Sequence, residues 1–213
     1  MIDVSNLKDA LETLGFVAHG DIHEKVFPEI GCSLKVDFHA KKLIYPNEIK
    51  GRERNNGFDK KENFVVFECV CRLLSKGYRP EHIELEKEWH LGHDAKGGRA
   101  DICVSDTSGN MLFIIECKTW GREYDKALNN TKSDGAQLFS YWQQEQSCKW
   151  LVLYASDLRS GCIAYKAPTI DCSDDANIVL LSKKDKSIKL YRDAHTTSAK
   201  YEAWKETYGS QIH

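Results

Sequence analysis

The chain has 213 residues, enough for one sizeable hydrophobic core with a small appendage but not for two full catalytic domains. Apolar residues make up 41% of the sequence and charged residues 29%, which is ordinary for a folded globular protein and excludes a largely disordered chain. The 30 lysine and arginine residues are balanced by 32 acidic residues. Any binding to nucleic acid would therefore depend on a local basic face and not on the overall field of the protein.

The sequence also lacks features that would assign other functions. No stretch approaches the roughly 18 consecutive apolar residues of a membrane span, so we expect a soluble protein with no membrane partner. The eight cysteines form no CxxC pair and no signal peptide precedes them, which indicates reduced thiols and a cytoplasmic location. There is neither a phosphate-binding loop nor a dinucleotide fingerprint, so a motor or methyltransferase working with this chain would lie elsewhere.

Residues 1–60 are predicted to form an N-terminal helix and a small β appendage. A short amphipathic helix is expected over residues 5–14, with Ser5 as its N-cap and Gly15 as its stop. Alternating apolar residues predict strands over residues 22–27, 34–38 and 43–45. Residues 46–60 are polar and contain glycine and asparagine, which marks a surface loop and a domain boundary.

The main domain is expected over residues 61–192. Apolar residues at helical spacing predict a helix over residues 61–76, stopped by Gly77. Three strands follow over residues 83–91, 99–104 and 111–117, and the short turn between the last two predicts a meander. The run from Met111 to Ile115 has no polar face, which is typical of a strand covered by helices on both sides.

The rest of the chain is expected to alternate between helices and strands. A polar loop over residues 121–132 leads to a helix over residues 133–144, capped by Ser133 or Asp134, and then to a buried strand over residues 150–155. Shorter strands are expected near residues 162–165, 178–181 and 188–191. Residues 193–213 would hold a final helix, over residues 197–208, that can lead into a further domain of a larger protein.

Three charged residues mark the end of the predicted meander. Asp101 lies on its second strand, and Glu116 and Lys118 end its third strand on one face, because alternate residues of a strand point to the same side. Glu116 follows five apolar residues, and a charge that ends a buried strand needs a partner or water. Phosphodiester hydrolysis requires charge stabilisation and a hydroxide near neutral pH, and a divalent metal can supply both.

Magnesium suits these residues because it prefers hard oxygen ligands and keeps several waters. We expect Asp101, Glu116 and the backbone carbonyl of Cys117 to bind Mg²⁺, with Mn²⁺ able to replace it. Lys118 would lie beside the metal-bound water, where it could orient that water, lower its pKa or neutralise charge in the transition state. The alternative for each residue taken alone is a solvated charge at a strand end.

Three short motifs follow one another in this part of the chain. They are Gly98-Arg99-Ala100-Asp101-Ile102, Glu116-Cys117-Lys118 and Gln137-Leu138-Phe139-Ser140-Tyr141. Their order and spacing resemble the PD-(D/E)XK nuclease superfamily, in the QxxxY branch that contains RecB-like and type I restriction nucleases. Ala100 stands where the namesake proline would be, at a position that varies across the superfamily. The resemblance implies a restriction-endonuclease-like three-layer α/β/α core with a mixed central sheet.

The resemblance also implies a role for each motif residue. Asp101 and Glu116 would bind metal, and Lys118 would be catalytic. Gln137 and Tyr141 share a helix face and would contact the DNA backbone or support the geometry of the site. The alternative for this last pair is a solvent-facing glutamine and a core tyrosine.

Superfamily members often carry a further glutamate on the helix before the meander. Glu68 is the candidate for this catalytic carboxylate, because it lies at the margin of the apolar face, near Phe64 and Cys71. From there it could reach the metal directly, through water or through Lys118. Glu62 is its rival on the same helix.

Basic residues gather around the motif loops in the sequence. They would contact phosphates and fix the register of DNA without reading bases, and solvated loop charges are an equal alternative. The residues are Lys96, Arg99, Arg122, Lys126 and Lys132.

The resemblance covers roughly residues 61–156. More loosely, the whole chain is similar to the N-terminal nuclease region of type I-like or single-chain (type ISP) restriction-modification enzymes. It implies a Mg²⁺-dependent endonuclease acting on double-stranded DNA in restriction or DNA defence, with helicase-like translocase and methyltransferase or specificity domains or subunits as partners. Two alternatives remain, a non-catalytic DNA-binding or assembly module with a nuclease fold and a RecB-like DNA repair nuclease.

Overall fold

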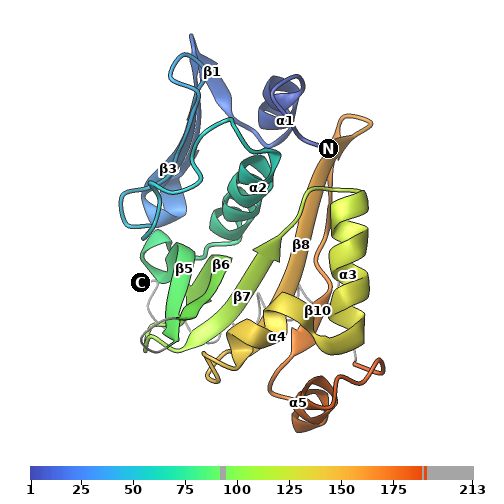
Figure 1. The fold of residues 1–213 in the computed structure, drawn as a ribbon. Helices are drawn as coiled ribbons and strands as arrows, with labels where there is room; N and C mark the ends of the chain where they lie inside the picture. Colours follow the sequence, from blue (N-terminus) through green and yellow to red (C-terminus); the bar gives the residue numbers. More distant parts are fainter. Residues whose placement is uncertain (92–94, 189, 191–213) are drawn as a thin grey trace.

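The computed structural model describes residues 1–91, 95–188 and 190. Its main part is a mixed β-sheet between two layers of helices, and a smaller antiparallel sheet lies at the N-terminal end (Figure 1). The predicted fold class, an α/β/α core with a small α+β appendage, is confirmed.

The central sheet of the described chain has six strands. Their order is β10-β8-β7-β6-β5, and β9 pairs with the far end of β8. β5, β6 and β7 form the predicted antiparallel meander, whereas β7 and β8 run parallel and are joined through helices, as a parallel pair requires. The bounds are β5 Ile83–Leu91, β6 Ala95–Ser105, β7 Met111–Cys117, β8 Trp150–Arg159, β9 Cys162–Lys166 and β10 Thr169–Asp171.

Helices cover both faces of this sheet. α2 (Lys61–Ser75) is almost wholly buried on one face, and α3 (Arg122–Asp134) and α4 (Ala136–Trp142) lie on the other (Figure 1). The alternation of side chains follows from this arrangement. Ile115 and Tyr154 belong to the core on the α2 side, whereas Ile114 and Leu153 belong to the core under α3 and α4.

The polar loop expected over residues 121–132 is wrong, because most of this segment forms α3. Most of its residues are polar, which conceals an apolar stripe at helical spacing, formed by Tyr124, Ala127, Leu128 and Thr131. The helix expected over residues 133–144 also begins later than predicted. Gly135 has a left-handed φ of 73° and separates α3 from α4.

The N-terminal elements pack against α2. α1 (Leu7–Thr13) and a four-stranded antiparallel sheet share one hydrophobic core with this helix, in which Phe16 and Tyr45 both contact Phe67. The helix starts later than predicted, because Ser5 binds Asp3 and does not cap it. The strands are β1 Val17–His19, β2 Ile22–Phe27, β3 Cys32–Asp37 and β4 Lys42–Ile44.

The C-terminal part differs most from the prediction. The strand expected at residues 178–181 is wrong, because these residues lie in helix α5 (Asp175–Ser182), where the Asp174 side chain accepts a hydrogen bond from the N–H of Ala176. Of the strand expected at residues 188–191, residues 188 and 190 have no regular structure and residues 189 and 191 lie outside the described chain. The helix expected over residues 197–208 lies outside it as well.

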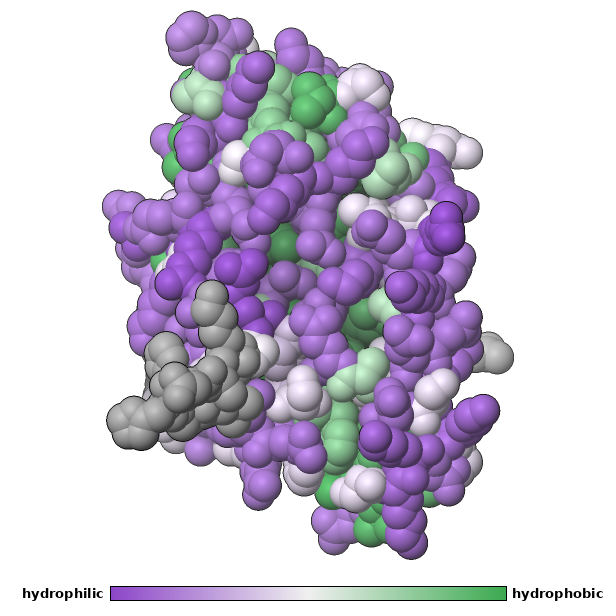
Figure 2. Space-filling model, in the orientation of Figure 1, coloured by the Kyte–Doolittle hydropathy of each residue, from purple (hydrophilic) through white to green (hydrophobic). Residues whose placement is uncertain are grey.

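Because most large hydrophobic side chains are buried, the surface is mainly polar. In the orientation of Figure 1, Figure 2 shows a mostly hydrophilic face on which hydrophobic residues form small scattered areas. None of the helices in the described chain is long and apolar enough to cross a membrane. None of the eight cysteines, all of which lie in the described residues, takes part in a disulfide.

Candidate active site

The site forms where two strands of the meander separate. The pairing of β6 with β7 at this end stops at Ile102 and Ile115. Beyond it, the N–H of Cys117 donates a hydrogen bond of 2.6 Å to Oδ2 of Asp101. The carboxylate therefore occupies the place that a backbone acceptor would take in a continued ladder, and Asp101 lies directly beside the end of β7.

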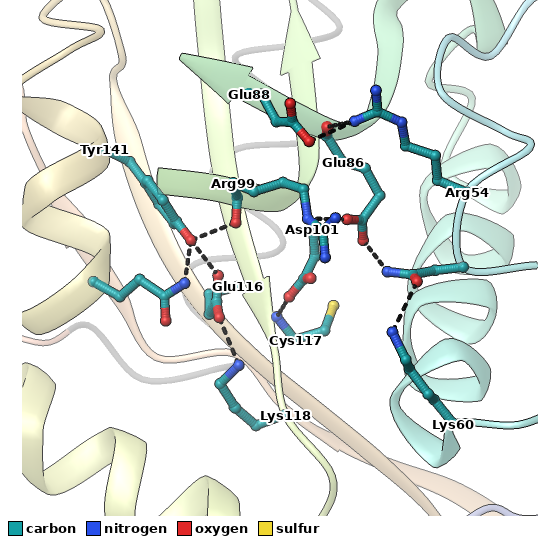
Figure 3. A network of polar contacts seen from close by, with 12 residues as sticks. Arg54, Lys60, Glu86, Glu88, Arg99, Asp101, Glu116, Cys117, Lys118 and Tyr141 are labelled. Atoms are coloured by element: carbon teal, nitrogen blue, oxygen red, sulfur yellow. Dashed lines mark hydrogen bonds and ion pairs between the residues drawn. The ribbon is translucent and has the colours of Figure 1, made fainter. Parts of the chain in front are cut away.

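Glu116 and Lys118 complete the group at the end of β7 (Figure 3). Glu116 is 4% exposed, and its Oε1 accepts a hydrogen bond of 2.5 Å from Nζ of Lys118. The backbone N–H of Lys118 donates to the carbonyl of Tyr154 on β8, which holds the chain in register after the strand ends. The structure thus brings together all three charged residues that the sequence singles out.

The electrostatics of this group favour a cation. Burial, and then the charge of Glu116, raises the pKa of Asp101 well above its usual range. Burial also raises the pKa of Glu116, although Lys118 opposes this shift. For Lys118, burial lowers the pKa of the ammonium, but Glu116 and then Glu62 outweigh it, so its pKa is raised and it stays protonated. Two carboxylates are held close together with too little positive charge between them.

The donor set suits Mg²⁺ or Mn²⁺. Asp101 and Glu116 supply hard carboxylate oxygens, and the carbonyl of Cys117 points to the same side of β7 as its N–H, towards Asp101. Within the described chain, no three histidine, cysteine, aspartate or glutamate side chains are grouped closely enough to hold a metal by themselves. Magnesium takes few protein ligands and keeps several waters, so two carboxylates and one carbonyl are a sufficient protein share for it.

Tyr141 of α4 buttresses the site from the other side. Its side chain is fully buried, and its hydroxyl lies 2.5 Å from the carbonyl of Arg99 and 3.1 Å from Oε2 of Glu116. Gln137, one turn earlier, donates to the same hydroxyl. The ring packs so closely on Gly98 that a Cβ there would lie 2.4 Å from Cε1 of the tyrosine. Tyr141 is therefore a core residue that also lies beside Glu116, and Gln137 is linked to Glu116 through the Tyr141 hydroxyl.

The structure places Glu68 away from this group, contrary to the position expected for it. Glu68 is 1% exposed and accepts hydrogen bonds of 2.7 Å from Arg72 and 2.6 Å from the hydroxyl of Tyr154. The rival, Glu62, lies 3.3 Å from Nζ of Lys118. The two glutamates are six residues apart, which is about 9 Å along a helix and a different side of it. Periodicity alone could not show which end of α2 faces the site.

A cleft of about 450 Å³ opens onto these residues. Glu62, Glu116 and Lys118 line one side of it, and the unpredicted helix α3 lines the other. Among the basic residues singled out in the sequence, Lys126 lines this cleft. The side chain of Lys96 lies outside the part of the chain that the structure describes. The residues from α3 and the start of α4 are Glu123, Lys126, Ala127, Asn130, Thr131, Ala136, Gln137 and Leu138.

The fold is therefore a mixed sheet between helical layers, with Asp101, the buried Glu116 and Lys118 together at the end of its meander, and the family match puts this α/β domain in the restriction-enzyme class. The chain belongs to the family described as the type I restriction enzyme R protein N terminus. The model of this family matches residues 62–170, just over half of the chain, and the match spans Asp101, Glu116, Lys118, Gln137 and Tyr141. No curated protein matches the chain.

Proposed function

We propose that this chain is a Mg²⁺-dependent endonuclease domain that hydrolyses phosphodiester bonds of double-stranded DNA. The observation that carries the proposal is the gathering of Asp101, Glu116 and Lys118 at the separated end of β6 and β7, where Glu116 and Lys118 line a cleft. Both carboxylates have raised pKa values, and strongly perturbed carboxylates concentrate at functional sites. The family assignment supports the same conclusion.

Asp101, Glu116 and the carbonyl of Cys117 would hold the metal ion. Bound Mg²⁺, or Mn²⁺ in its place, supplies charge stabilisation to the phosphoryl group and activates water. Asp101 is held in position by the N–H of Cys117, and Glu116 by the hydroxyl of Tyr141. Both carboxylates are thereby preorganised, with little freedom left to lose when the cation binds.

Lys118 acts as a positive charge and a hydrogen-bond donor. Its raised pKa keeps the proton on Nζ, which argues against a role as general base and for neutralising charge that develops on the phosphate. Glu62 serves as the helix carboxylate, because it contacts Nζ of Lys118 and lines the cleft. Glu68 stabilises α2 through Arg72 and Tyr154.

The cleft between the end of β7 and α3 would receive the DNA backbone, with Lys126 as a phosphate contact. Recognition of a target sequence would come from other components. Helicase-like translocase and methyltransferase or specificity domains or subunits are the partners that the family suggests, and the cytoplasm is the compartment in which they would meet DNA.

Cleavage of supercoiled plasmid in Mg²⁺ tests the proposal, with Lys118→Ala compared with wild type. Losing one donor to a developing charge typically lowers the rate by about 100- to 1000-fold. Lys149→Ala, at the opposite end of β7 and β8, is the matched control and should cut like wild type. Cleavage that survives in Lys118→Ala contradicts the proposal. A folded wild-type chain that binds DNA but neither binds Mn²⁺ nor cuts would instead be a DNA-binding module.

A further inference from the structure

Glu86, in the middle of β5, has a conformation that needs an explanation. Its φ is +55°, a left-handed value that a strand residue other than glycine adopts only at an energetic cost. Its residue is also 4% exposed, so a carboxylate is buried in an edge strand of the central sheet. Backbone strain that the surroundings maintain is typical of functional positions.

The buried carboxylate of Glu86 joins two parts of the chain (Figure 3). It forms an ion pair with Nε of Arg99 on β6 and accepts a hydrogen bond from Nδ2 of Asn55. Its backbone carbonyl lies 3.4 Å from Nη1 of Arg54, which also pairs with Glu88 at 2.8 Å. Asn55 and Arg54 belong to the loop that follows the N-terminal sheet, so this loop reaches the edge of the active-site strands.

Arg99 lies beside the site. It is two residues before Asp101 on β6, on the same face of the strand. The register of β5 with β6, in which Leu85 opposes Ile102 and Lys87 opposes Ala100, puts Glu86 opposite Asp101. The Arg99 side chain is 48% exposed, and the ion pair engages Nε, which leaves the N–H donors of its two terminal amino groups outside this contact.

We propose that Glu86 is a positioning residue that holds the guanidinium of Arg99 to bind a second phosphate of the DNA, next to the one that is cleaved. The loop of residues 46–60 braces this arrangement through Asn55. The inference rests on the proposed nuclease function and adds a phosphate clamp to it. A guanidinium fixed by a buried carboxylate has lost its side-chain freedom before DNA arrives, which reduces the entropic cost of the contact.

The negative charge of Glu86 allows one substitution to distinguish positioning of Arg99 from a simple effect on the local electrostatic field. If Glu86 only contributed to the local field, Glu86→Gln would remove a negative charge near DNA and strengthen binding. If Glu86 instead positions Arg99, the same substitution should weaken DNA binding. We expect Glu86→Gln and Arg99→Ala each to weaken binding of the full chain to a labelled duplex oligonucleotide in EDTA by about tenfold, the size of one charge-assisted hydrogen bond.

Glu84→Gln is the matched control, because Glu84 lies on the same strand but pairs with Lys87. It removes the same charge and should leave binding unchanged or slightly stronger. Arg99→Lys keeps the charge on a half-exposed residue that does not endanger the fold, yet it loses Nε and the planar fork, so it should bind as weakly as Arg99→Ala. Glu86→Gln combined with Arg99→Ala should bind no more weakly than Arg99→Ala alone.

Glu86→Gln that binds DNA as well as or better than wild type overturns the proposal, as does full binding by Arg99→Lys or additive losses in the double variant. Calorimetric titration of the same variants with Mn²⁺ separates this failure from failure of the nuclease proposal. Glu86→Gln should bind Mn²⁺ like wild type, because Glu86 holds Arg99 and not the metal ligands. A wild-type chain that binds no Mn²⁺ would instead contradict the nuclease proposal itself.

Discussion

The N–H of Cys117 donates to Oδ2 of Asp101 at 2.6 Å, across the point where β6 and β7 stop pairing. This hydrogen bond satisfies the backbone N–H of Cys117 at the end of β7. It also fixes the Asp101 carboxylate and leaves the other carboxylate oxygen, Oδ1, outside the bond. The fold and the site share this contact, so substitutions of Asp101 can separate structure from function.

Asp101→Ala and Asp101→Asn should differ in stability. Alanine leaves the buried N–H of Cys117 without its acceptor, which costs about 1–3 kcal/mol of unfolding free energy. Asparagine can accept the same bond and removes a half-buried charge that Glu116 repels, so it should be as stable as wild type or more stable. Chemical denaturation in EDTA measures both variants. Equal losses of unfolding free energy in the two variants would show that the hydrogen bond from Cys117 to residue 101 contributes nothing to stability.

The two glutamates of α2 should behave in opposite ways. Glu62→Gln should keep the stability of wild type and lower the cleavage rate, because Glu62 lies at the surface of the cleft and contacts Lys118. Glu68→Gln should keep metal binding and lower the unfolding free energy by about 1.5–3 kcal/mol, the usual value of a hydrogen bond to a charged group. Chemical denaturation and plasmid cleavage, measured on both variants, distinguish the roles of the two glutamates. The reverse pattern would restore Glu68 as the catalytic carboxylate.

Substitutions of Tyr141 and of Gly98 should both disturb the site, because the Tyr141 ring packs directly on Gly98. Tyr141→Phe removes the hydroxyl beside Glu116 and should cost about 0.5–1.5 kcal/mol of stability. Gly98→Ala places a methyl group against the ring, and the resulting overpacking should cost about 1–3 kcal/mol and slow cleavage through displacement of the same ring. Denaturation and initial cleavage rates measure both effects. Wild-type behaviour of Gly98→Ala would mean that the ring can move without disturbing the site.

Stabilisation by metal should grow with pH. Burial and Glu116 raise the pKa of Asp101 in the metal-free protein, and burial raises that of Glu116. A raised folded-state carboxyl pKa favours the fold at low pH, and this contribution is lost as pH rises through the raised value. A cation favours the ionised forms, so the shift of the unfolding midpoint by Mn²⁺ should increase over that window and be smaller in Asp101→Asn. A shift that is independent of pH, or that declines as pH rises, contradicts this account.

The sequence predicts that Glu116 and Lys118 lie together at a strand end because the signals for this are local. Five apolar residues before Glu116 identify a strand covered on both faces, and alternation puts Lys118 on the same side as Glu116. The conflict between a buried strand and a charged end indicates chemistry. The fold class follows from the same pattern of strands and helices.

The missed features depend on long-range contacts or on weak signals. α3 is mostly polar, and its stripe at Tyr124, Ala127, Leu128 and Thr131 is easily overlooked, whereas the apolar run in α5 imitates a strand. The choice between Glu62 and Glu68 depends on how α2 lies on the sheet. Glu86 carries no signal in the sequence, because its backbone conformation and its contact with Asn55 arise only in the folded chain.

The central claim is that Asp101 and Glu116 form a divalent-metal site, and calorimetric titration of the chain with Mn²⁺ tests it most directly. Wild type should bind Mn²⁺ and Asp101→Asn should not, whereas Asp125→Asn, which removes an exposed carboxylate from α3, should bind like wild type. Metal binding does not require that the chain cleave DNA without partners. Equal binding by wild type and Asp101→Asn, or no binding by a folded wild-type chain, would contradict the account.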